Sequence, residues 1–224
     1  MKTRIQRILC ATDLSDVSHQ VVPCGIALAE KINAQLFICH VIDLPTISVY
    51  GEAVFDPITQ QQRFIDFARR EIEKQMENTA VQWQQLITIG HTTEEIARLA
   101  AENDIDLVIT ATHGRSGLKR LFLGSVTERL MRTLNCPLMV LRTEEADAEP
   151  ARPCLPFKRI LVGCDFSEDA DTAFRCSLNM AQEFESELHL VHVVEPTAYK
   201  EHLKFPSAAG EPLPKELHDS IRER

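Results

Sequence analysis

Two stretches of the sequence decide the fold: Arg7-Ile-Leu-Cys-Ala-Thr-Asp-Leu-Ser-Asp16 and Arg159-Ile-Leu-Val-Gly-Cys-Asp-Phe-Ser-Glu168. They lie 152 residues apart, and the alignment continues without a gap to His40-Val41 and His192-Val193. Of the 37 aligned positions from 7 to 43, ten are identical in the two copies. The spacing is too long for a solenoid repeat, so the sequence indicates a duplicated domain.

The first copy alternates between two hydrophobic patterns. Continuous apolar runs predict buried strands, and amphipathic segments that follow capping residues predict helices. The predicted strands are 6–11, 35–42, 82–89, 106–111 and 137–141, and the predicted helices are 17–32, 57–78, 92–102 and 125–134. This order predicts the α/β class, with an open five-stranded parallel sheet and helices on both faces.

Capping residues fix three of these helix starts. Ser15 and Asp16 are placed to cap the helix at 17–32. Thr92–Glu95 and Ser125–Glu128 each have the spacing of a capping box.

The two copies differ in extent. We predict a first domain at 1–143, a linker at 144–156 and a partial second domain at 157–224. The linker is acidic and contains three prolines, a composition typical of connecting segments. The second copy holds only the first β-α-β portion, so we expect either a chain cut from a longer tandem protein or completion by a neighbouring chain.

Composition excludes several classes of protein. The 224 residues are 44% hydrophobic and 25% charged, which is ordinary globular usage. A net charge of −9 disfavours binding to the nucleic-acid backbone. The longest apolar runs fall short of the roughly 20 residues of a membrane helix, and the N-terminus lacks a secretory signal pattern. Seven cysteines, without a Cys-x-x-Cys pair, favour free thiols in the core, and we expect a cytoplasmic protein.

Topology alone locates a candidate ligand site. In open parallel sheets, ligands bind beyond the carboxyl ends of the strands, at the point where the strand order reverses. If the first and fourth strands are neighbours there, the site is built by Ala11-Thr12-Asp13 and by the segment 111–124.

The segment after the fourth strand carries the features of a phosphate site. Its glycines at 114, 117 and 124 allow close backbone approach, and Ser125 opens a helix whose first N–H groups lack helical partners. Ser125 and Thr127 add hydroxyl groups. The segment also contains three basic residues in an acidic chain: Arg115, Lys119 and Arg120. These features suit a phosphate, although a glycine-containing turn with solvated basic side chains would also explain them.

These residues resemble the nucleotide-binding signature of universal stress proteins: Gly-x-x-Gly, nine residues, then Gly-Ser or Gly-Thr. Gly114, nine residues and Gly124-Ser125 fit this spacing. The resemblance extends to Ala11–Ser15, to His40-Val41 and to Asn135-Cys-Pro-Leu-Met-Val140. It covers the first copy and the second as far as that copy goes, and it implies the adenine-nucleotide alpha hydrolase-like fold. In tandem members of the family, the resemblance implies that the two domains pack as an internal pseudo-dimer, often through their fifth strands. The predicted strand at 137–141 has no counterpart in the second copy, so we expect a homo-oligomer through the edge of this strand.

The resemblance implies ATP, ADP or AMP as the ligand, accompanied by Mg²⁺ or Mn²⁺. Asp13 would face the ribose or a phosphate-bound metal, Ala11 and Thr12 would border the ribose, and Val41 would present backbone groups to adenine. The implied phosphate neighbours are His113, Gly114, Arg115, Gly124, Ser125, Val126 and Thr127.

One residue departs from the signature: its first glycine falls on Ala111. The added methyl group leaves open a second hypothesis, a ligand-free dimerising scaffold. A third hypothesis, a related adenylating enzyme, lacks support because we identify no P-loop lysine and no catalytic triad in the sequence. We expect at most slow ATP hydrolysis and assign no catalytic residue. His40 and His192, on predicted buried strands, are interpreted as satisfied core histidines.

Overall fold

The computed structural model describes residues 5–15, 18–43, 57–112, 124–142 and 157–194. The chain divides into two compact units, Met1–Leu155 and Pro156–Arg224, which are treated separately below. The predicted domain and linker boundaries fall at residues 143–157, most of which lie outside the described ranges, and they stay predictions.

The first unit is the predicted five-stranded parallel sheet. Its strands stand in the order β3-β2-β1-β4-β5, and every described pairing is parallel. The strands are β1 (Arg7–Ala11), β2 (Gln35–Ile42), β3 (Trp83–Ile89), β4 (Leu107–Ala111) and β5 (Leu138–Leu141). The helices are α1 (Val21–Ile32), α2 (Pro57–Met76), α3 (Thr92–Glu102) and α4 (Ser125–Thr133). The predicted fold class is therefore confirmed.

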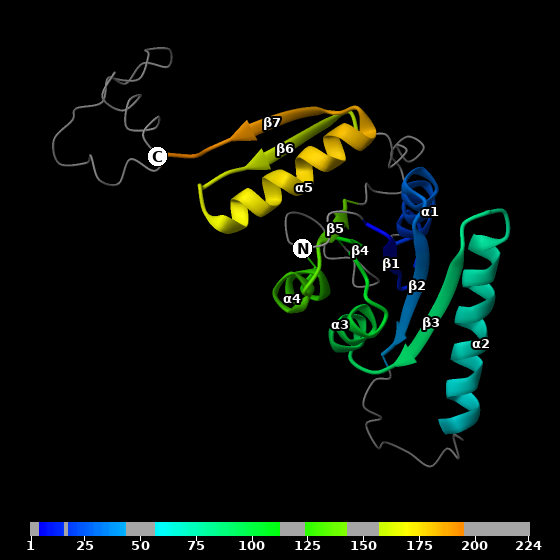
Figure 1. Ribbon diagram of the computed structural model, residues 1–224. Coiled ribbons are helices and arrows are strands. Elements are labelled where there is room, and N and C mark those ends of the chain that lie inside the picture. Colours follow the sequence, from blue (N-terminus) through cyan, green and yellow to red (C-terminus); the bar gives the residue numbers. More distant parts are fainter. Residues whose placement is uncertain (1–4, 16–17, 44–56, 113–123, 143–156, 195–224) are drawn as a thin grey trace, which may run out of the picture. The chain divides into compact units, whose positions relative to one another are not determined.

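Alternation along the strands divides the core between the two faces of the sheet. Leu9 and Phe37 belong to one buried cluster with Ile96 and Leu99 of α3 and Leu130 of α4. The opposite face is covered by α1 and α2, and Figure 1 shows α2 and α3 on opposite sides of the strands β2 and β3. The central strands β1 and β4 are thus buried on both faces, which explains why they read as continuous apolar runs.

The helix starts correct three local predictions. None of the N-caps of α1, α3 and α4 makes a side-chain capping hydrogen bond, and the caps are Gln20, His91 and Gly124. The helix predicted from residue 17 begins at Val21. Ser15 does not cap it, because the N-cap is Gln20, five residues further along the chain; the Ser15 hydroxyl donates to Asp13 Oδ1 at 2.6 Å. Glu95 does not complete a capping box either, since its carboxylate accepts from Thr88 Oγ1 at 2.8 Å and from Arg98.

The described cysteines are mostly the expected free thiols. Cys10 and Cys39 are buried and free, and burial raises the pKa of both thiols, that of Cys39 to about 12. Cys24 is disulfide-bonded, so the expectation of free thiols is wrong there. Within the ranges the structure describes, no helix is both long enough and apolar enough for a membrane span.

The second unit repeats the start of the first. It contains β6 (Arg159–Gly163), α5 (Glu168–Phe184) and β7 (Glu187–Val191), with β6 and β7 paired in parallel. Leu161 is 71% exposed, whereas its counterpart Leu9 is fully buried. The described part of this unit holds no counterpart of α3 or α4, the helices that cover Leu9 in the first unit.

The tightest helix contact in the first unit generates a prediction. A Cβ added at Gly25 of α1 would lie 2.2 Å from Cys10 Sγ and 3.1 Å from Leu36 Cδ1. We expect Gly25→Ala to lower the free energy of unfolding by about 1–3 kcal/mol, because overpacking outweighs the helix propensity gained from alanine. Denaturant unfolding measures the change. Gly163→Ala is the control, since a Cβ there meets no atom within 4 Å; equal stability of the two variants would contradict the predicted overlap.

Candidate functional site

The candidate site lies where the strand order reverses. β1 pairs with β2 on one side and with β4 on the other, so the chain leaves β1 and β4 at adjacent points of the same sheet edge. The register pairs Cys10 with Ile109. Continued by two residues, it brings Thr12 beside Ala111. This is the arrangement that topology predicted from the sequence.

The loop after β1 is held by a compact set of hydrogen bonds. Thr12 N donates to Cys39 O at 3.0 Å, which extends the β1–β2 pairing by one residue. The chain then turns at Leu14, whose φ of 58° lies in the left-handed region. Asp13 Oδ1 accepts from both Ser15 N, at 3.1 Å, and Ser15 Oγ. Asp13 is half-buried, and these two hydrogen bonds fix its carboxylate in position at the sheet edge.

Thr12 is buried and ties the loop to the approach to α1. Its hydroxyl is 2.9 Å from Ser18 Oγ and accepts from Leu14 N at 3.1 Å. Ser18 also bonds back to Ser15 through the Ser15 carbonyl oxygen. Thr12 and Asp13 thus organise the loop together with Ser15, which the sequence analysis proposed as a helix cap and not as a site residue, and Ser18, which it did not single out.

The amino end of α4 is docked on the end of β4. Gly124 N donates to Thr112 O at 2.9 Å, and Thr127 Oγ1 donates to Ala111 O at 3.1 Å. A Cβ at Gly124 would lie 2.6 Å from Thr112 O, so a glycine is required for this close approach. The role predicted for Thr127, a hydroxyl donor to phosphate, is not what the structure shows, because its side chain is 2% exposed and bonded to the strand.

The first turn of α4 presents backbone N–H groups at the same sheet edge. The helix begins at Ser125, and its first backbone hydrogen bond runs from Glu128 N to Gly124 O. The N–H groups of Ser125, Val126 and Thr127 precede that bond and carry the positive end of the helix dipole. The expected capping box is wrong: the cap is Gly124, and the Glu128 carboxylate accepts from Arg132 instead. Ser125 is exposed, and Val126 is partly buried.

Val41 lies near the end of β2 and directs its peptide groups past the end of β1. Leu36 N and Ile42 O bond on the β3 side, at 2.9 and 3.2 Å, whereas Cys39 O accepts from Thr12 N on the β1 side. The N–H and C=O groups of successive strand residues point to opposite sides, so those of Val41, two residues after Cys39, point to the β1 side as the Cys39 carbonyl does. β1 ends at Ala11, so the N–H and C=O of Val41 face the region beyond it.

Ala111, the departure from the signature, is buried at the end of β4. Its register and the alternation along β4 place its methyl group on the face of Cys10 and Ile109, the face that α1 covers. α4 packs on the other face through Leu130. The methyl group is therefore directed away from the amino end of α4.

Three predicted site residues, His113, Gly114 and Arg115, lie outside the described residues, as do Gly117, Lys119 and Arg120. The structure brings the other predicted residues to one sheet edge: Ala11, Thr12, Asp13, Val41, Ala111, Gly124, Ser125, Val126 and Thr127. Among the residues that the structure describes, no group of three or more His, Cys, Asp or Glu could hold a metal ion.

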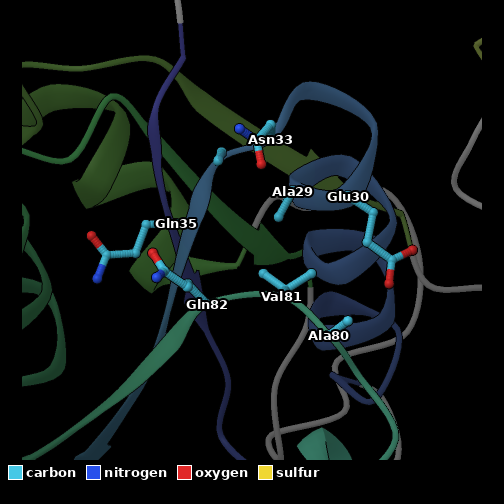
Figure 2. Close-up of a pocket in the computed structure, with 8 residues that line it drawn as sticks. Ala29, Glu30, Asn33, Gln35, Ala80, Val81 and Gln82 are labelled. Carbon is cyan, nitrogen blue, oxygen red and sulfur yellow. The ribbon is translucent and has the colours of Figure 1, made fainter.

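A hollow of about 550 Å³ lies at the opposite end of the sheet, between the end of α1 and the start of β3. Figure 2 shows Ala29 and Glu30 of α1 on one side of it and Val81 and Gln82 on the other. Its lining contains the Glu30 carboxylate and amide side chains, without a lysine or arginine. This lining does not suit an anionic phosphate, so the hollow is not the predicted site.

Comparison with known proteins identifies the class. A model of the universal stress protein family matches residues 4–142 and again residues 156–223. The chain belongs to the universal stress protein family, in a tandem arrangement. It is 31% identical to the universal stress protein YxiE of Bacillus subtilis over 150 residues, which cover 61% of this chain and 98% of YxiE.

Two further relatives agree. A universal stress protein of Methanocaldococcus jannaschii is 28% identical over 139 residues, which cover 61% of this chain and 82% of the relative. The crystal structure of a universal stress protein from Archaeoglobus fulgidus matches with a TM-score of 0.66 at 20% identity, covering 99% of this chain and 75% of that one. This last likeness concerns the fold.

The contact between α4 and β4 generates a prediction. Thr127→Val keeps the volume of the side chain but leaves the buried Ala111 carbonyl without the hydroxyl that donates to it. We expect a loss of about 1–3 kcal/mol in the free energy of unfolding of the first unit. Thr133→Val is the matched control, because its exposed hydroxyl bonds only to Arg129 O within the same helix, and a change within about 0.5 kcal/mol is expected. Comparable losses in both variants would contradict the docking role of Thr127.

Proposed function

We propose that this protein binds an adenine nucleotide (ATP, ADP or AMP) at the carboxyl ends of β1 and β4, and that it acts as a nucleotide-dependent regulatory protein in a cytoplasmic stress response. The observation that carries the proposal is the docking of the amino end of α4 on β4 through Gly124 N and Thr112 O, 2.9 Å apart. This contact directs the early N–H groups of α4 to the strand-reversal point, where an anionic group binds favourably.

The nucleotide spans the two loops in this proposal. Its phosphates bind the N–H groups of Ser125, Val126 and Thr127, and the segment with His113, Gly114 and Arg115 completes that end. Asp13 faces the ribose, or an Mg²⁺ or Mn²⁺ ion carried by the phosphates. Ala11 and Thr12 border the ribose.

The base lies against the end of β2. Val41 offers a backbone donor and a backbone acceptor on the side beyond β1, and the adjacent acceptor and donor on the edge of adenine match this pair. The binding groups in this proposal are thus mostly backbone groups. We assign no catalytic residue to this site.

Calorimetric titration of the full chain with ATP and Mg²⁺ tests the proposal. We expect saturable binding, and no saturation at millimolar nucleotide would overturn it. Gly124→Ala should weaken binding by roughly tenfold or more, because its Cβ forces the amino end of α4 away from Thr112 O. Gly163→Ala, in the second unit, is the control and should bind as the parent does.

The alternative hypothesis is the ligand-free dimerising scaffold, in which Ala111 blocks the site. The direction of the Ala111 methyl group, toward the α1 face, favours nucleotide binding instead. Ala111→Gly decides between them: binding that appears only in this variant would establish the scaffold. We also propose that β5, one of the two edge strands of the sheet, pairs with another copy through its half-buried residues, which light scattering of the purified protein would measure as a dimer.

A further inference from the structure

We propose that His40 is a positioning residue for the nucleotide site: by holding the Thr12 carbonyl, its imidazole sets the course of the loop after β1 and keeps the peptide groups of Val41 available to a ligand. The ligand part of this inference rests on the proposed function. The positioning part concerns the chain alone and is tested separately.

The first observation is the contact itself. His40 is 9% exposed, and its Nδ1 lies 2.9 Å from Thr12 O. A carbonyl oxygen can only accept, so Nδ1 carries the proton and donates. Thr12 is the first residue after β1, and its N–H still belongs to the strand pairing through Cys39 O. The imidazole therefore acts at the peptide where the chain leaves the sheet.

The second observation concerns the hydrogen bond that this contact replaces. If the β1–β2 pairing continued, Thr12 O would accept from Val41 N, the next residue of β2 that faces β1. Among the described residues, no backbone hydrogen bond joins these two atoms. The His40 side chain satisfies the carbonyl in place of Val41, and the strand pairing ends there.

The third observation is that the second copy contains the same contact between a histidine ring and the carbonyl that follows its first strand. His192 Nδ1 lies 2.6 Å from Cys164 O, and both residues stand 152 positions after His40 and Thr12. Cys164 N donates to Val191 O as Thr12 N does to Cys39 O. His192 is exposed, and its ring contacts that of Phe166 with 4.6 Å between the centroids, so the contact with Cys164 O forms without the burial that surrounds His40.

The loop that follows the held carbonyl has the same form in both copies. Phe166 has a φ of 65°, against 58° for Leu14. Asp165 Oδ1 accepts from Ser167 N at 3.0 Å and from Ser167 Oγ at 2.6 Å, as Asp13 Oδ1 does from Ser15. The pairing of a histidine with a turn of this form thus recurs under two very different degrees of burial.

The test uses the full chain with His40→Leu, which removes the donor, and His40→Asn, whose side-chain amide can donate from near the Nδ1 position. Amide hydrogen exchange is followed at Leu14 and Ser15, with Ile8 and Leu9 as internal references in β1. If His40 positions the loop, His40→Leu raises exchange at Leu14 and Ser15 by roughly tenfold while β1 stays protected, and His40→Asn restores much of the protection. Unchanged exchange at Leu14 and Ser15 in His40→Leu would overturn the positioning role, whether or not the protein binds a nucleotide.

The same variants are then titrated with ATP and Mg²⁺. We expect His40→Leu to bind roughly fivefold to tenfold more weakly, in line with the loss of one hydrogen bond, and His40→Asn to recover affinity. His192→Leu removes the same contact in the second unit and should leave ATP affinity unchanged. Equal affinities of the parent and His40→Leu would overturn the link to the ligand, whereas a parent that binds no nucleotide overturns the proposed function and leaves the exchange result to decide the positioning role.

Discussion

The parallel pairing of β1 with both β2 and β4 is the constraint on which the candidate site depends. The chain runs from β1 outward to β2 and β3, and then crosses back over the sheet to β4 and β5. The carboxyl ends of β1 and β4 are therefore left side by side, although no single helix connects these two strands. Every described group of the site reaches this edge from β1, β2, β4 or the amino end of α4.

The duplicated loop separates local from global causes of structure. In both copies the turn after the first strand is built from hydrogen bonds between residues two positions apart, and its left-handed residue has nearly the same φ. The second unit forms this turn although Leu161 and other counterparts of core residues are exposed. The turn therefore follows from the local sequence, whereas burial of the sheet requires the elements of the second half of the domain.

The helix caps show where local patterns mislead. Serine, threonine and aspartate before an amphipathic segment favour a capping interaction in isolation. In the first unit Ser15 lies five positions before Gln20, the N-cap of α1, and Glu95 and Glu128 bind Arg98 and Arg132 instead of closing a capping box. In α5 the expected pattern is observed, since Ser167 Oγ accepts from Ala170 N at 3.1 Å.

The sequence by itself determined the fold class, the duplication and the limits of the first five strands to within one residue, because a buried parallel strand is an apolar run that can be recognised without knowing its partners. It also indicated which two loops meet on the condition that the first and fourth strands are neighbours, and the structure supplied that strand order. Only the tertiary structure decided that the Thr127 hydroxyl donates to Ala111 O at the end of β4, that Gly124 is needed for contact with Thr112 O, and that His40 bonds to Thr12 O. These contacts join residues from 12 to 28 positions apart, and the atom that each side chain meets is set by the packing of whole elements, which no local pattern records.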